Sequence, residues 1–223
     1  MSLTKPMKKL SIIKKGQIMQ YKYLLILRYS LINLVGLVFL FVLITQGYVS
    51  KAIKADITNM VIVILVLFSV GFILAAYRTF WLSREINYSH LKVLPPNSIA
   101  KDFLQNSKKL DASSRNNLAA SLRIKLSSKI NYIKFMANTL VILGLIGTVI
   151  GFIIALSGVD GSVSSNPEEV SKMVSTLIQG MSVALYTTLV GSICSVWLNI
   201  CYQIMSTGAN NLLSKIIELG EKK

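Results

Sequence analysis

Four long apolar stretches dominate the sequence. They run over roughly Leu31–Tyr48, Ile57–Leu82, Phe135–Leu156 and Val174–Met205. Each is long enough to cross a hydrocarbon core of about 30 Å, which takes about 20 helical residues. The apolar positions are continuous rather than alternating, which indicates helices and not the strands of a barrel. The pattern therefore predicts an all-α integral membrane protein with four transmembrane helices and a short helical cytoplasmic segment.

The polar segments divide the chain into five predicted regions. These are a basic cytoplasmic arm at 1–30, a first transmembrane hairpin at 31–82, a cytoplasmic helical segment at 83–134, a second transmembrane hairpin at 135–206 and a cytoplasmic tail at 207–223. The start of the arm mixes lysines with apolar residues, which fits an interfacial helix and a partly disordered tail equally well. We expect no cleavable signal peptide, because the first apolar stretch is too long for an h-region.

The cytoplasmic segment is predicted to contain two short amphipathic runs. The proline pair at 95–96 interrupts it, after which Asn97 or Ser98 can cap a helix that carries Ile99, Phe103 and Leu110 on one side. The second run has an apolar residue at every fourth position. Its members are Leu118, Leu122, Leu126 and Ile130. We interpret this second run as an inner extension of the third span.

Charge is distributed unevenly between the two sides of the predicted membrane. The chain has 24 Lys+Arg against 9 Asp+Glu, a formal net charge of +15. Most basic residues lie before the first span, between the second and third, and in the tail. The other two connections contain only Lys51, Lys54 and Lys172, offset by Asp56, Asp160, Glu168 and Glu169. By the positive-inside rule both termini are predicted to be cytoplasmic. Topology and anionic lipid account for the charge, and without a basic stripe interleaved with aromatics no nucleic-acid partner is expected.

Residues that could carry catalysis are nearly absent from the sequence. The single histidine, His90, lies among polar residues with no nucleophile or ligand set nearby in sequence. Cys194 and Cys201 lie one heptad apart on one helix face, and we interpret them as reduced, structural thiols. There is no phosphate-binding glycine loop and no metal-spaced cluster. The sequence therefore predicts a protein that is not an enzyme and needs no metal or cofactor.

The third and fourth spans differ from the first two in carrying ordered small and hydroxyl residues. In the third span these are Gly144, Gly147, Thr148, Gly151 and Ala155. In the fourth they are Gly180, Ala184, Thr187, Thr188, Gly191, Ser192 and Ser195. Such stripes let helix backbones approach closely. Ordinary packing explains most of the glycines and alanines, whereas the hydroxyls of Thr148 and Thr188 could line a polar path.

Two motifs in these spans resemble a known family. The run "LGLIGTVIGFIIA" covers Leu143–Ala155, and "IQGMSVALYTTLVGS" covers Ile178–Ser192. Together they resemble the signature of the MotA/TolQ/ExbB proton channel family, in which a "GLxGTVxG" helix is paired with an "ALxTTxxG" helix. The resemblance extends over about the last 90 residues, with both halves in the family's order and separation.

The resemblance implies an ion-driven motor in the bacterial inner membrane. The chain would form a homopentameric ring around the single-span helices of a MotB/TolR/ExbD-like partner that carries a transmembrane aspartate, and the flow of H⁺ or Na⁺ would move that partner. The implied ion pathway is Thr148, Thr188, Thr187 and Ser192. The implied helix-packing positions around the partner are Gly144, Gly147, Gly151, Ala155, Gly180, Ala184 and Gly191.

Departures from the family pattern refine this hypothesis. Val183 stands where ExbB and TolQ members have a glutamate, and four spans resemble MotA more than the three-span members. Neither of the last two spans contains an Asp, Glu, Lys, Arg or His, so a titrating carboxylate has to come from a partner. The leading hypothesis is a motor ring subunit. The alternatives are a structural or regulatory four-span protein and a self-sufficient channel, which would need an intramembrane charge of its own.

Overall fold

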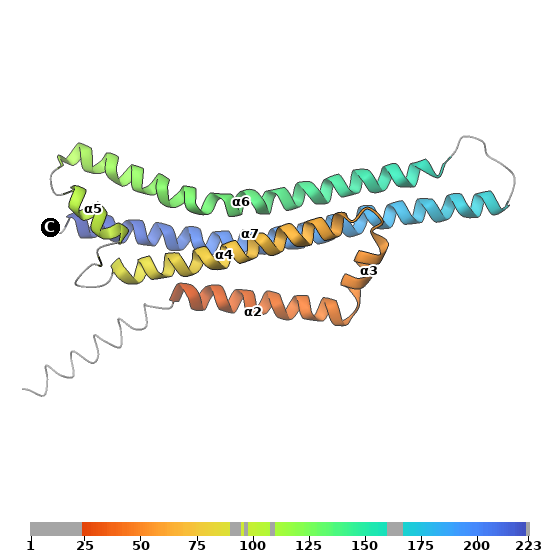
Figure 1. The fold of residues 1–223 in the computed structure, drawn as a ribbon, viewed down its shortest axis with the longest axis horizontal. Coiled ribbons are helices and arrows are strands. Elements are labelled where there is room, and N and C mark those ends of the chain that lie inside the picture. Colours follow the sequence, from red (N-terminus) through yellow and green to blue (C-terminus); the bar gives the residue numbers. More distant parts are fainter. Residues whose placement is uncertain (1–23, 90–94, 96–97, 108–109, 160–166, 222–223) are drawn as a thin grey trace, which may run out of the picture. The chain divides into compact units, whose positions relative to one another are not determined.

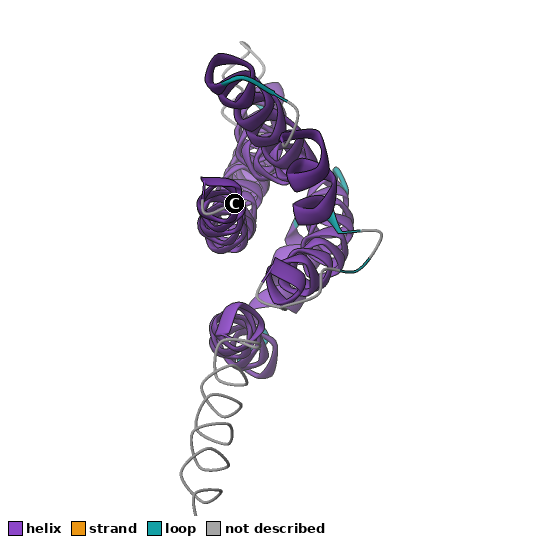
Figure 2. Cartoon of the chain, turned by 90° about the vertical axis from the view of Figure 1, so that its left-hand side faces the viewer, coloured by secondary structure: helices purple, strands orange, loops and turns teal. Residues whose placement is uncertain are grey.

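The computed structural model describes residues 24–89, 95, 98–107, 110–159 and 167–221, and this part of the chain is helical apart from short turns (Figure 2). The helices are α2 (Leu24–Thr45), α3 (Tyr48–Ala55), α4 (Met60–Ser89), α5 (Ile99–Ser107), α6 (Ala112–Ser157) and α7 (Pro167–Glu221) (Figure 1). Four of them, α2, α4, α6 and α7, are long and apolar enough to cross a membrane. The predicted all-α architecture with four spans is confirmed. Most of the basic arm and His90 lie outside the described residues.

The helices extend beyond the apolar stretches that predicted them. Helix α2 begins before Leu31, α4 continues past Leu82, and α7 runs on from the fourth apolar stretch to Glu221. A change from apolar to polar composition marks the expected membrane surface, but polar residues with good helix propensity let the helix continue into water. The connection after the first span, predicted as a loop, contains the helix α3, whose Ala52 is buried and whose lysines are exposed.

Both predicted elements of the cytoplasmic segment are present. Ser98 Oγ accepts a hydrogen bond from the Lys101 backbone N–H at 3.3 Å and so caps α5. The amphipathic run of Leu118 to Ile130 lies within α6, with Leu126 and Ile130 buried, so the prediction that this run continues the third span is confirmed. Helix α5 ends at Ser107, so Leu110 lies outside it.

The chain forms two compact units, each of which takes segments from several helices. One unit comprises Met1–Asn33, Ala76–Asn131 and Cys201–Lys223, and the other comprises Leu34–Ala75 and Tyr132–Ile200. The first unit contains most of the segment predicted to be cytoplasmic, and the second contains α3 and the motif-bearing parts of α6 and α7. They are called the inner unit and the channel unit below, after the predicted position of the first and the predicted role of the second.

The inner unit has an apolar core with a polar cluster at its edge. Its core includes Leu82 of α4 and Leu212 and Ile216 of α7, each exposed by no more than 1%. In the polar cluster, the Asn33 side-chain amide donates to the Tyr29 carbonyl oxygen at 2.7 Å. The Asn33 side-chain oxygen accepts a hydrogen bond from Cys201 Sγ of α7 at 3.5 Å, so this buried amide is satisfied on both sides and links α2 to α7.

Aromatic rings join α4 to α7 in the channel unit. The Trp197 ring lies 5.4 Å from the Phe68 ring and 5.8 Å from the Phe72 ring, measured between centroids. Gly36 of α2 lies directly against the Trp197 indole, where a Cβ atom would collide with the ring. Glycine at this position therefore lets α2 approach α7 closely.

Candidate functional site: the seam between α6 and α7

The two motif-bearing helices meet along a seam of very small residues in the channel unit. A Cβ atom added at Gly144 would lie 3.2 Å from the Thr187 carbonyl oxygen and 3.3 Å from Thr188 Cα. At Gly180 it would collide with the backbone of Ala155 and Gly151. The helix backbones are thus in direct contact, which only residues without bulky side chains permit.

All seven predicted packing residues are buried in this seam. They are Gly144, Gly147, Gly151, Ala155, Gly180, Ala184 and Gly191. We expected them to surround the helix of a partner, but in the structure the α6 and α7 stripes cover one another within a single chain. The physical reason is that two complementary bare stripes on adjacent helices gain most contact by facing each other. The seam therefore shapes the hairpin and presents its other faces outward.

Thr187 lies inside the seam. Its side chain is fully buried against Gly147, and its hydroxyl donates to the Val183 carbonyl oxygen of its own helix at 2.8 Å. This placement differs from the expectation that Thr187 belongs to the ion pathway, because its hydroxyl is sealed from any aqueous or partner-facing surface of the hairpin. Sequence alone does not separate adjacent threonines whose directions differ by about 100° around the helix.

The other three hydroxyl residues lie at the margin of the seam. Thr188 Oγ donates across it to the Gly144 carbonyl oxygen at 3.1 Å and is partly exposed. Thr148 is also partly exposed, and its hydroxyl donates to the Leu145 carbonyl oxygen within α6. Ser192, one turn after Thr188, is exposed. The structure thus leaves Thr148 and Thr188 partly exposed and Ser192 exposed on the surface of the hairpin.

The two spans that form the seam contain no Asp, Glu, Lys, Arg or His from Phe135 to Leu156 and from Val174 to Met205. Val183, at the position of the family glutamate, is fully buried, so an apolar side chain suits it and a charged one would need a partner. Cys194 and Cys201 are both buried and free, as predicted. Within the described part of the chain no three metal-ligating side chains come together. The hairpin thus combines accessible hydroxyls with a lack of carboxylates in its two spans.

Sequence reasoning missed the contacts that attach α2 and α4 to this hairpin. These contacts are the cluster of Trp197 with Phe68 and Phe72 and the fit of Gly36 against the indole. The available signal was a glycine in an otherwise bulky apolar span, which marks a close approach without naming its neighbour.

Comparison with known proteins agrees with the motifs. The profile described as the MotA/TolQ/ExbB proton channel family matches residues 94–218, which is more than half of the chain and includes both helices of the seam. Neither the search of curated proteins nor the search of solved structures gave a match. Four helices able to span a membrane, together with this profile, make the chain a multi-pass membrane protein. The chain belongs to the MotA/TolQ/ExbB proton channel family.

Proposed function

We propose that this protein is the ring subunit of a proton- or sodium-driven motor complex in the bacterial inner membrane. In this proposal it assembles as a homopentamer, with both termini in the cytoplasm, around the single-span helices of a MotB/TolR/ExbD-like partner. Ion flow between ring and partner moves the partner. Membership of a proton channel family supports an ion-driven role in general. The geometry of the seam supports the proposed route of the ion past the accessible hydroxyls.

One observation carries the proposal most strongly. The family hairpin is closed on itself through its small residues, while Thr148, Thr188 and Ser192 remain accessible at its margin. Because contacts between small residues hold the two helices together, the hairpin presents a rigid surface without the help of a partner. Hydroxyls on such a surface can replace part of an ion's hydration shell as the ion passes.

The partner has to contribute the titrating group. From Phe135 to Leu156 and from Val174 to Met205 the chain has no ionisable Asp, Glu, Lys, Arg or His. Inserting an isolated charge at the centre of a bilayer costs about 3 kcal/mol or more, so a carboxylate there is kept only where it functions. In the proposed mechanism the partner's aspartate binds the ion beside the threonine hydroxyls. When this aspartate loses and regains its charge beside the apolar surface of the hairpin, the favoured position of the partner changes.

A structural four-span protein is the second candidate, and one observation favours it. The Thr188 hydroxyl donates a hydrogen bond to the Gly144 carbonyl oxygen. Helix packing alone is therefore enough to explain a threonine at this position. The two candidates differ in the expected effect of removing this hydroxyl. In a packing protein only stability changes, whereas in a motor subunit ion flow changes as well.

The test compares two neighbouring threonines in the complete complex with its partner. Thr188→Val keeps the side-chain shape and removes the accessible hydroxyl. Thr187→Val removes a buried hydroxyl that bonds only within its own helix. In liposomes with an imposed pH or Na⁺ gradient, we expect Thr188→Val to slow dissipation about tenfold, the effect of about 1.4 kcal/mol on a barrier. Thr187→Val should leave the rate within about threefold of the unchanged protein.

Two results would argue against the proposal. The first is an unchanged ion flux in Thr188→Val, in a complex that size-exclusion chromatography shows to be intact. Thr188 would then have a role in helix packing and none in ion flow. A sustained ion-selective current from this chain without any partner would show that the ring conducts unaided, and the inference of a borrowed carboxylate would then be wrong.

A further inference from the structure

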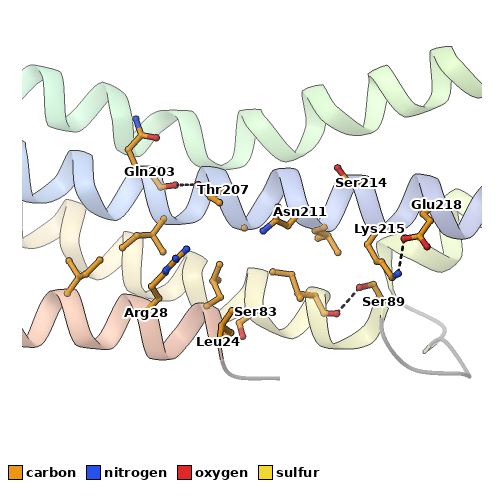
Figure 3. Close-up of a pocket in the computed structure, with 16 residues that line it drawn as sticks. Leu24, Arg28, Ser83, Ser89, Gln203, Thr207, Asn211, Ser214, Lys215 and Glu218 are labelled. Carbon is orange, nitrogen blue, oxygen red and sulfur yellow. Dashed lines mark hydrogen bonds and ion pairs between the residues drawn. The ribbon is translucent and has the colours of Figure 1, made fainter. Parts of the chain in front are cut away.

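A groove of about 650 Å³ lies in the inner unit between α2, α4 and α7 (Figure 3). One part of its lining is apolar and includes Leu24, Ile32, Ile86 and Ile204. The other part is polar and includes Arg28, Gln203, Asn211 and Lys215. A cavity with one apolar wall and one cationic, hydrogen-bonding wall suits an amphipathic ligand with an anionic head.

The groove lies at the level where the apolar stretches end. Arg28 and Ile32 flank the start of the first stretch at Leu31, Ser83 follows the end of the second, and Gln203 and Ile204 precede the end of the fourth. These stretches were delimited independently by composition, and their inner ends meet in one groove. The groove is therefore at the depth of the lipid headgroups of the inner leaflet.

Arg28 is the cation of this groove that has no acidic neighbour among the described residues. It is exposed, and Figure 3 shows its guanidinium directed from α2 toward α7. No described carboxylate forms an ion pair with Arg28, and the groove's acid, Glu218, is paired with Lys215 at 2.8 Å. Residues 1–23 contain six lysines and no Asp or Glu. This segment therefore supplies no carboxylate that could pair with Arg28.

The helix that carries Arg28 also lacks cover in the protein. Only 11% of the most apolar window of α2 is buried, against 44% of that of α7. Leu27 and Leu31, next to Arg28 on α2, are 62% and 59% exposed. Acyl chains descending from a headgroup at Arg28 would lie along this apolar surface.

We propose that this groove binds one anionic phospholipid of the inner leaflet. The Arg28 guanidinium holds the headgroup phosphate through paired N–H donors, a geometry for which arginine is suited. The exposed amide of Asn211 forms the rim on α7, and the acyl chains pack on α2. This role does not depend on ion conduction, so it stands or falls separately from the motor proposal.

The test titrates the detergent-solubilised full chain with phosphatidylglycerol and, separately, with phosphatidylcholine. Lipid adducts are counted by native mass spectrometry. We expect phosphatidylglycerol to bind with an apparent Kd about tenfold below that of phosphatidylcholine, and Arg28→Gln to remove this preference. Arg123→Gln is the matched control, because Arg123 is an exposed arginine of the inner unit that does not line this groove. It should leave the preference unchanged.

Asn211→Leu provides a second variant that leaves α2 untouched. It removes an amide from the opposite wall, and we expect phosphatidylglycerol to bind about threefold more weakly. The proposal is wrong if both lipids bind equally to the unchanged protein, or if Arg28→Gln keeps the preference. Displacement of phosphatidylglycerol by equimolar inorganic phosphate would also overturn it, since the site would then recognise a free anion rather than a lipid.

Discussion

At the scale of single residues, the loss of stability on replacing a glycine depends on which atoms lie nearest to the added side chain. A side chain at Gly180 would collide with the backbone of Ala155 and Gly151, which cannot move without separating α6 from α7. At Gly220, on the same helix, the nearest atom is the tip of the Phe103 ring at 3.2 Å, which can yield slightly. These two glycines therefore have different roles despite identical chemistry.

Gly180→Ala should destabilise the protein by about 1–3 kcal/mol, because overpacking forces the two backbones apart. Gly220→Ala is the matched control. It should change stability by no more than about 1 kcal/mol, since the gain in helix propensity offsets a small adjustment of Phe103. Chemical unfolding in detergent, followed by circular dichroism, measures both. Equal stability of the two variants would show that the seam is looser than the structure indicates.

At the scale of elements, a single buried carboxylate connects α5 to α4. Glu85 Oε2 accepts a hydrogen bond from the Ile99 backbone N–H at 3.3 Å, at the first turn of α5, and is 6% exposed. The first N–H groups of a helix have no partner within the helix, and a carboxylate there also interacts favourably with the helix dipole. On the apolar side of α5, Phe103 and Leu104 are buried and lie next to Gly220 of α7.

Glu85→Ala should loosen α5 by about 1 kcal/mol, the usual effect of losing a side-chain cap. Hydrogen exchange at Ala100 to Leu104 should then accelerate about fivefold, while exchange in the α6–α7 seam stays unchanged. Gln105→Ala, an exposed change on the same helix, is the control and should leave exchange nearly unaffected. If Glu85→Ala and Gln105→Ala behave alike, the Glu85 contact does not hold α5.

At the scale of the whole molecule, the distribution of charge predicts the orientation in the membrane. Ser113, at the end of α6 predicted to be cytoplasmic, and Ser171, at the end of α7 predicted to lie outside, are both exposed on described helices. The two native thiols, Cys194 and Cys201, are buried and give little background. Cysteine substitution at these serines therefore reports on the two faces separately.

In intact cells, an impermeant thiol reagent should label Ser171→Cys and leave Ser113→Cys unlabelled until the membrane is permeabilised. The difference should be about tenfold or more, because a membrane excludes the reagent from the inner face. Labelling of the unsubstituted chain is the control. The reverse pattern would contradict the predicted cytoplasmic termini and, with them, the direction of the proposed ion pathway.

Several features could be predicted from the sequence because they depend on nearby residues alone. The four spans result from the length of apolar stretches, and the cap at Ser98 and the buried run of Leu122, Leu126 and Ile130 result from residue type and spacing. The paired motifs also identified the family without reference to coordinates. A helix of lipid-soluble residues has few other conformations in a bilayer, so local composition is enough to define it.

Other features required the tertiary structure, because they depend on the rotation and neighbours of each helix. The sequence showed small stripes on two helices but not that they face each other, and it did not distinguish buried Thr187 from accessible Thr188. The contact of Gly36 with Trp197, far apart in the chain, was equally hidden. Periodicity determines which residues share a face, whereas packing against other helices determines what that face meets.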